Sequence, residues 1–347
     1  MLYIHQTSCI SPQQTFEPID IDTLRLSAEN LLRAKEPVYH HVPPAQLRRM
    51  GKAVKLSVEA AMPLLQGRPA IDGIIIGTGN GGMDDSIKFL NQIIEYDEGM
   101  LTPGNFVQST GNAPAATISM LTGNKSYNIT HVHRGQAFEN ALLDAIMQTA
   151  EHPQKTFLLG AVDEISDYNH HIEWLDGWYK QQPLLNKDLY AADSPGSMAG
   201  EGAAMFLVNG SAAGAIARCD KLQMFSSSDP EWIAEQCRIF VQEWLKEGDG
   251  VNLFLSGENG DHRLMPFYTA CESALGSSTN IARFKHMSGE YPTASAFGCW
   301  LICEMFQRRS IPAHMIKKAG RQTAGRHILL YNNYKGVQHS LMGWSLV

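Results

Sequence analysis

The chain has 347 residues, which is long enough to bury a large core as one big domain or as two fused halves. Apolar residues make up 44% and charged residues 18% of it, values typical of a globular protein and not of a disordered or fibrous one. The formal net charge of −7 argues against nucleic acid as a partner, because such binding needs a concentrated basic footprint.

The cysteines and the start of the chain indicate a cytoplasmic location. The six cysteines lack the spacing of a metal site, and Cys299 and Cys303 lie one helical turn apart among apolar residues, as expected of reduced core thiols. The first ten residues lack a basic region followed by a long apolar core, so we expect no secretory signal. No apolar run is long enough to cross a bilayer. We therefore expect no membrane span, no metal and no cofactor.

Short apolar runs alternate with helical patterns in the first half of the chain. We predict strands at residues 2–9, 74–76, 127–130, 156–162 and 203–208, and helices at 46–65, around 87–93 and at 137–150. The strands at 74–76, 127–130 and 156–162 read as buried. An aromatic, turn-rich insertion covers about residues 165–194, and its histidines His170 and His171 favour a surface or interface role over a metal site.

The same order of elements restarts after a stretch of small residues at 210–214. We predict a strand at 215–225, a helix at 232–245 capped by Asp229 with Pro230 in its first position, a strand at 251–255, a helix at 293–306, and closing strands at 328–331 and 340–347. Strands and helices alternating twice over predict an α/β fold of two similar halves, residues 1–210 and 211–347.

A strand-to-helix elbow at residues 131–135 is the centre of this pattern. Such elbows often carry a nucleophile, because unpaired N–H groups and the helix dipole stabilise an anion there. No Ser, Cys or Thr lies between His131 and Arg134. Positive charge at the positive end of a helix is unfavourable, so we expect His133 or Arg134 to contact a carboxylate, a bound anion or a partner chain; the alternative is that both reach solvent.

Two other features look like sites and have ordinary explanations. Gly77, Gly79 and Gly82 match the dinucleotide fingerprint after a strand and before a helix, but Asp97 does not end a clear second strand, which favours close backbone packing. A basic patch, Arg48, Arg49, Lys52 and Lys55, is small and typical of a solvated helix face.

Several segments together resemble the β-ketoacyl synthase group of the thiolase superfamily along nearly the whole chain. They are RRMGKAVKLSVEAA, IIIGTGNGGMDDSIKFL, TPGNFVQSTGNAPAATISM, LLGAVDE, MAGEGAAMFLV, KHMSGEYPTASAFG and, in degraded form, NNYKGVQHSLM. The resemblance implies a thiolase-like, five-layered αβαβα fold with two pseudo-symmetric halves. It also implies a dimer and work on acyl chains carried as thioesters on acyl carrier protein.

Active members of that group carry a cysteine at the elbow and two histidines. Matching the motifs residue by residue, Gly135 fixes the nucleophile position at Val132, which has no covalent chemistry. The first histidine position falls on Asn259, or on Glu258 or His262 if the gap shifts, and the second falls on Glu290. The family's lysine is retained as Lys285. In the final turn, Gln338 replaces the usual asparagine, and Asn332 and Tyr334 replace the paired phenylalanines.

The resemblance is therefore closest to a non-catalytic, chain-length-factor-type subunit, as in aryl-polyene, flexirubin-like or type II polyketide systems. Such a subunit pairs with an active ketosynthase as a heterodimer, works with acyl carrier protein, and shapes the acyl tunnel of polyketide or fatty-acid-type synthesis. If Val132 is buried, it fills the space that a thioester would need. We expect Phe106, Gln108, Asn112 and Met120 to face the partner and this tunnel.

Three alternatives stay open. The chain could be an active 3-oxoacyl carrier-protein synthase or acyltransferase that uses His131 or His133 as a base, with Glu290 and Lys285 as partners. It could instead be a homodimeric acyl-binding scaffold. Finally, Thr269, Ala270 and Cys271 spell a nucleophile-like triplet, but they lie on a predicted helix without a glycine elbow, which favours an ordinary core thiol.

Overall fold

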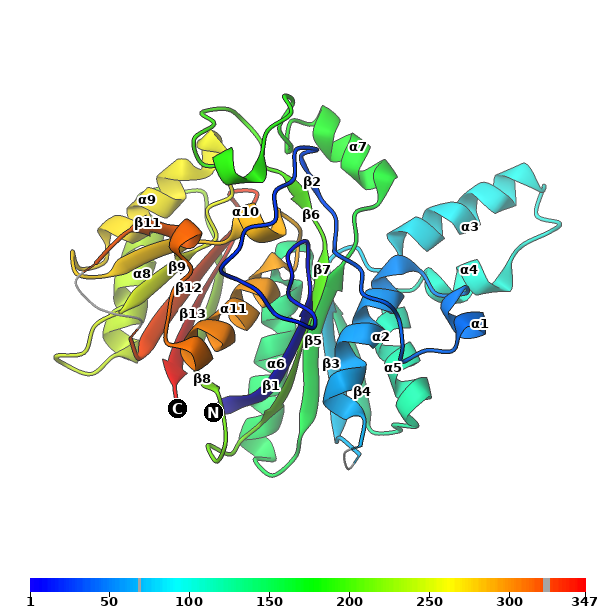
Figure 1. The fold of residues 1–347 in the computed structure, drawn as a ribbon, viewed down its shortest axis with the longest axis horizontal. Helices are drawn as coiled ribbons and strands as arrows, with labels where there is room; N and C mark the ends of the chain where they lie inside the picture. The colour runs from blue at the N-terminus through cyan, green and yellow to red at the C-terminus, as the bar shows by residue number, and fades with distance from the viewer. Residues whose placement is uncertain (68–69, 321–324) are drawn as a thin grey trace.

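The computed structural model describes residues 1–67, 70–320 and 325–347. A mixed sheet of eleven strands runs through these residues in the order β11-β10-β9-β12-β13-β8-β1-β7-β5-β3-β4. Helices pack on both faces of each half of this sheet (Figure 1). The expected α/β class is therefore confirmed.

The first half contributes five strands, which lie side by side as β4-β3-β5-β7-β1. Their bounds are β1 Leu2–Ile10, β3 Gly73–Thr78, β4 Tyr127–Val132, β5 Phe157–Asp163 and β7 Gly202–Asn209. The second strand, β3, pairs in parallel with the third and fourth strands, β4 and β5. The fifth, β7, pairs antiparallel with the first and the fourth.

The second half repeats this arrangement strand for strand as β10-β9-β12-β13-β8. Their bounds are β8 Ala217–Ser226, β9 Leu253–Ser256, β10 Asn280–Arg283, β12 His327–Tyr334 and β13 Gln338–Leu346. Strand β9 pairs in parallel with β10 and β12, and β13 pairs antiparallel with β8 and β12. The two first strands, β1 and β8, pair antiparallel and join the halves. The expected pseudo-symmetry is thus present in the backbone pairing.

Three pairs of helices complete the five layers. Helices α6 Ala137–Glu151 and α11 Ala294–Arg308 lie between the half-sheets, in one apolar cluster with strand residues of both halves such as Phe206 and Leu255. Helices α2 Lys52–Leu65 and α5 Ala113–Thr122 cover the outer face of the first half. Helices α8 Pro230–Trp244 and α9 Met265–Ser273 cover that of the second.

The remaining elements are short or lie outside these layers. They are α1 Pro44–Leu47, α3 Met83–Glu95, α4 Pro103–Gln108, α7 Asp167–Leu175, α10 Lys285–Ser288, β2 Leu31–Leu32, β6 Ala199–Gly200, β11 Ile316–Lys318, and 3-10 turns at Arg134–Gln136, Asn186–Asp188, His262–Leu264 and Ala313–Met315. Figure 1 shows α3 and α4 extending away from the sheets as an arm, and the insertion with α7 above the strand ends.

Most of the predicted helices and strands are present. The side chain of Asp229 accepts the N–H groups of Glu231 and Trp232 and so caps α8 as expected. The helix predicted at 46–65 is instead divided into α1 and α2, with Gly51 as an extended N-cap, because glycine is a poor helix former. Strands β10 and β11 have four residues or fewer with polar ends, so no pattern predicts them.

The strand at 127–130 is present, but the prediction that it is buried was wrong. It is part of β4, which among the described strands lies at the edge of the sheet beside β3, so its side chains are exposed or half-buried. The local pattern of residues indicates that a segment favours a strand. Whether that strand lies at the edge of a sheet depends on which distant segments pair with it, so the pattern could not predict it. Within the described residues, no helix has both the length and the apolar character needed to cross a membrane.

Candidate functional site

The predicted elbow is confirmed as a structural feature. Strand β4 ends at Val132, a 3-10 turn follows, and α6 begins at Ala137. Arg134 takes the left-handed conformation there, with φ of 49°. A Cβ on Gly135 would lie 2.2 Å from the Cβ of Tyr334, so the Tyr334 side chain leaves no room for a larger residue. The Gly135 N–H donates to the side-chain oxygen of Gln338 over 3.1 Å, which ties the elbow to β13.

The nucleophile-equivalent position holds a hydrocarbon at the surface of this chain. Val132 is 61% exposed, because β4 is an edge strand. In the register it lies beside Thr78, and its Cγ2 would be 3.1 Å from a Cβ built on Gly111. The condition under which Val132 would fill a thioester's space, that it is buried, is therefore not met in the single chain. Its side chain still offers no sulfur or oxygen for attack on an acyl group.

A carboxylate does face the charged elbow, but its partner is His131. The Nε2 atom of His131 lies 3.0 Å from Oδ2 of Asp144 on α6, and the Tyr127 hydroxyl donates to the same carboxylate over 2.9 Å. His133 and Arg134 are exposed, and within the described part of the chain their side chains form no ion pair. The carboxylate contact expected of His133 or Arg134 is thus made by His131 instead.

The other predicted positions meet in one buried hydrogen-bonded network. The Lys285 ammonium donates to Oε1 of Glu290 over 2.6 Å, and the Asn259 amide donates to Oε2 over 2.9 Å. Lys285 is fully buried, and Asn259 is 4% exposed. Both carboxylate oxygens of Glu290 are therefore occupied, and its charge is balanced by the lysine. This arrangement fixes the loop that carries Glu290, and none of its three side chains is an imidazole that could polarise a thioester.

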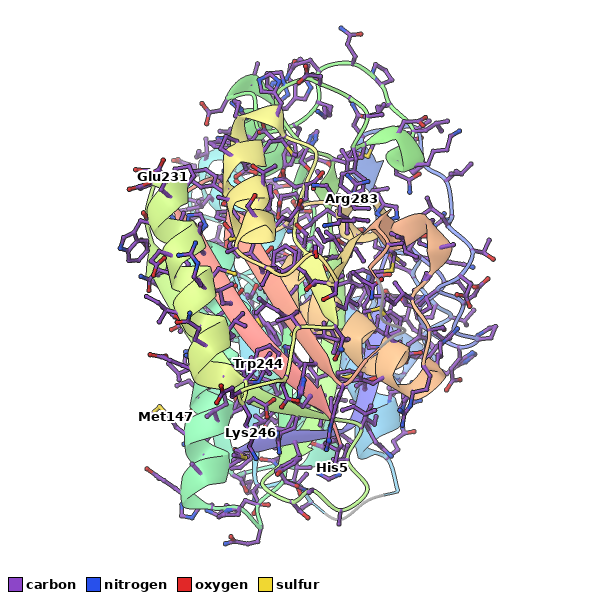
Figure 2. All side chains as sticks on the ribbon, turned by 90° about the vertical axis from the view of Figure 1, so that its left-hand side faces the viewer. His5, Met147, Glu231, Trp244, Lys246 and Arg283 are labelled. Carbon is purple, nitrogen blue, oxygen red and sulfur yellow. The ribbon has the colours of Figure 1, made fainter. Side chains whose placement is uncertain are left out.

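The two alternatives for the first histidine position lie in other interactions. Glu258 accepts Arg283 over 2.8 Å and Lys317 over 2.6 Å, while His262 lies 3.5 Å from Asp193 with its side chain 42% exposed. Arg283 lies near the level of Glu231 at the start of α8 and well above Lys246 in Figure 2. Of the three candidates, the hydrogen bonds reach Glu290 from Asn259 alone.

Asp163 is a site residue that the sequence analysis missed. Its buried carboxylate accepts hydrogen bonds from the Thr78 hydroxyl, the N–H groups of Gly79 and Asn80, and both the N–H and hydroxyl of Thr293. Burial raises its pKa to about 6 in spite of these donors. It fixes the glycine turn after β3 to the start of α11, between the elbow and Glu290. An acid directly after an apolar strand is the signal that could have found it.

The same contacts explain the glycine turn. The N–H groups of Gly79 and Asn80 point at Asp163 instead of forming an open phosphate cradle, and a Cβ on Gly79 would lie 2.3 Å from Pro292. Close backbone packing, the preferred explanation from the sequence, matches this geometry.

The insertion covers the region above the network. The Tyr179 hydroxyl donates to Glu173 of α7 over 2.7 Å, and Lys335 of the β12–β13 turn donates to the same carboxylate over 2.6 Å. The void that remains between Tyr179, Tyr291 and neighbouring side chains measures about 20 Å³. His170 stacks on Tyr179 and His171 on Trp174. Within the described residues, no three His, Cys, Asp or Glu side chains are placed to hold a metal.

The cysteines lie in the interior of the protein. All six are unpaired and buried. Cys271, the thiol of the nucleophile-like triplet at 269–271, lies on α9. Burial raises its pKa well above the usual value, and the neighbouring Cys237 adds to this effect. A thiol that stays protonated is a poor nucleophile, as expected of an ordinary core residue.

A separate apolar cavity brings together all four residues predicted to face the tunnel. Phe106, Gln108, Asn112 and Met120 line one cavity of about 590 Å³ between α1, α4 and α5. The side chains of Phe106 and Met120 are 58% and 82% exposed, so the cavity opens at the surface. Its size lies in the range of ligand pockets.

Comparison with known proteins agrees with this geometry. Residues 26–183 match the family described as beta-ketoacyl synthase, N-terminal domain. No curated protein matches the sequence.

Three solved structures superpose on the whole chain, and each is 98–99% covered in return. A beta-ketoacyl synthase from Burkholderia phymatum STM815 has 15% identity and a TM-score of 0.79. The ketosynthase ApeO in complex with its chain length factor ApeC, from Xenorhabdus doucetiae, has 12% and 0.79. The complex AntDE:AntF, a type II PKS acyl-carrier protein with its ketosynthase bound to the hexaketide, has 13% and 0.78.

At sequence identities this low, the structural superpositions establish a shared fold and nothing beyond it. Together with the sequence match over residues 26–183, they confirm the predicted resemblance to the β-ketoacyl synthases: the chain has a thiolase-like, ketosynthase fold throughout.

Proposed function

We propose that this ketosynthase-like chain is a non-catalytic, chain-length-factor-type subunit that pairs with an active β-ketoacyl synthase and shapes its acyl tunnel. One observation carries the proposal: at the elbow, where a nucleophile is expected, strand β4 ends in the hydrocarbon side chain of Val132. An aliphatic side chain forms no acyl-enzyme, so condensation would have to occur on another subunit.

The Lys285–Glu290–Asn259 network supports the same conclusion. Decarboxylation and enolate stabilisation need groups that donate toward the substrate and still have bonding capacity. Here the donors of Lys285 and Asn259 are directed at Glu290, and Lys285 and Asn259 are buried while Glu290 is partly buried. We assign this network to holding the loop that precedes α11.

Two surfaces suit a partner of the same fold. The edge of β4 beyond β3 leaves one row of N–H and C=O groups without a strand neighbour, which is a template for pairing with a second chain. The second surface is the arm of α3 and α4, which exposes apolar side chains, among them Ile94, Met100 and Val107 at 81%, 75% and 61%. Exposed apolar surface on this scale is typical of an interface.

The similar structures suggest the kinds of partner. One relative is a ketosynthase in complex with its chain length factor, and another is a ketosynthase with an acyl-carrier protein. We infer that this chain forms a heterodimer with an active synthase, that the pair receives acyl chains on acyl carrier protein in the cytoplasm, and that the product belongs to polyene, polyketide or fatty-acid-type synthesis. Residues 1–210 and 211–347 are the proposed structural halves.

Co-expression with a synthase that has the full cysteine and histidine set tests the proposal. Native mass spectrometry should show a one-to-one mixed dimer, and the mixed dimer should extend acyl chains while the chain alone does not. Homodimers that never exchange with the synthase would favour a scaffold role instead.

One observation favours a second candidate, an active acyltransferase. The contact between His131 and Asp144 is the arrangement by which carboxylates orient catalytic histidines. Condensation or malonyl decarboxylation by the isolated chain, lost in His131→Gln, would support that role and overturn the first.

A further inference from the structure

The apolar cavity between α1, α4 and α5 carries a single charge. Its lining includes the apolar side chains of Phe106, Ala116 and Met120, the amides of Gln108 and Asn112, and the guanidinium of Arg49. Most of this wall is hydrocarbon, and no carboxylate belongs to it. A single cation in such a wall differs from the mixed charges of ordinary surface.

That cation has no partner among the residues that the structure describes. Some nearby cations are neutralised: Lys52 lies 2.5 Å from a Glu201 oxygen, and Lys88 lies 3.7 Å from Asp84 and from Asp85. Arg48 forms no ion pair within the described residues, but it does not line the cavity. Arg49 is exposed and forms no ion pair or side-chain hydrogen bond in this part of the molecule. A guanidinium without a counter-ion beside an apolar cavity matches a ligand with a long apolar body and one anionic end.

Two further groups in the wall are unsatisfied. The side-chain carbonyl oxygen of Gln108 is buried and accepts no hydrogen bond. Asn112 begins α5 and forms no capping hydrogen bond, so the positive end of that helix also adjoins the cavity. Both features favour a ligand that brings polar atoms to the wall, and the helix end favours an anion.

We propose that this cavity binds a long-chain carboxylate, with its apolar chain along α4 and α5 and its carboxylate paired with Arg49. The inference deepens the proposed function, since it uses the tunnel-facing cavity. It adds that the chain held there ends in an anion instead of a plain methyl group. A free fatty acid and an acyl chain with a distal carboxyl group share this chemistry.

Calorimetry with dodecanoate, dodecanol and dodecanedioate tests the proposal on the full-length chain and on its complex with a synthase. Dodecanoate should bind at least about ten-fold more tightly than dodecanol, because the alcohol cannot pair with a guanidinium. Preference for dodecanoate by the isolated chain identifies a free acid. Preference for dodecanedioate by the complex identifies a distal carboxyl group on a held chain.

Three variants assign the effect to the cavity. Arg49→Met should remove the preference for the carboxylate, and Arg48→Met is the matched control, because Arg48 is one residue away and does not line the cavity. Ala116→Phe should block both the acid and the alcohol by filling the space. Equal affinity for acid and alcohol, an unchanged preference in Arg49→Met, or no binding to either the chain or its complex would overturn the proposal. Formation of the mixed dimer is measured by native mass spectrometry on the unchanged chain, so the two proposals fail separately.

Discussion

Replacing Lys285 by methionine should destabilise the protein strongly. The lysine is fully buried, and its ammonium lies 2.6 Å from Glu290. Methionine has a similar length, so the main loss is the charge pair, which leaves the carboxylate with Asn259 as its remaining partner. Removing one member of a buried pair costs about 3–5 kcal/mol, a large part of the total stability of a protein.

The expected pattern separates charge from packing. The double variant Lys285→Met/Glu290→Gln removes both charges and should recover most of the loss, because replacing a whole buried pair is often neutral. Lys318→Met is the matched control: Lys318 is exposed on β11 and forms no ion pair within the described residues, so it should change stability by less than about 0.5 kcal/mol.

Urea unfolding followed by tryptophan fluorescence measures these differences. The reasoning predicts a large drop in the midpoint for Lys285→Met, a small one for the double variant, and almost none for Lys318→Met. A single variant that unfolds at the same urea concentration as the control would show that the network is not structural. The assignment of Lys285 and Glu290 to holding the loop would then be wrong.

Three other results follow from particular residues. Burial raises the pKa of Glu139 to about 7, so the protonated form is favoured in the folded state, and the stability that it contributes is present below about pH 4.5 and lost as the pH rises through 7. The free energy of unfolding of Glu139→Gln, measured by thermal melts, should therefore rise relative to that of the native chain by up to about 3 kcal/mol between pH 5 and 8. A difference between the two proteins that does not change with pH would contradict this. Gly135→Ala places a methyl 2.2 Å from the Tyr334 Cβ and should lower the melting temperature by several degrees, whereas an unchanged value would mean that the elbow yields. Val132→Cys should react with iodoacetamide at the exposed elbow yet leave malonyl decarboxylation absent, since no histidine pair is restored; turnover would refute the assignment.

The sequence predicted local features better than their positions in the fold. The elbow follows from a strand, a glycine and a helical repeat between Tyr127 and Glu151, and the Asp229 cap follows from the helix that begins directly after it. That β4 is an edge strand depends on pairing between distant segments, so the exposure of Val132 could not be predicted from its own apolar run.

The site shows the same division. Resemblance to a family brought Asn259, Lys285 and Glu290 into one prediction, and the structure joins them by hydrogen bonds. Asp163 escaped because its donors come from residues 78–80 and Thr293, more than eighty positions away in either direction. The local sequence shows only an acid at the end of an apolar strand, and it does not show which distant donors that carboxylate meets.

The most direct test of a silent partner is the mass of the intact chain after incubation with acyl carrier protein carrying a labelled acyl group. An active synthase treated in parallel gains the acyl mass on its cysteine and supplies the positive control. The account predicts no gain for this chain, alone or within the mixed dimer. Stoichiometric acylation of any of its side chains would contradict it.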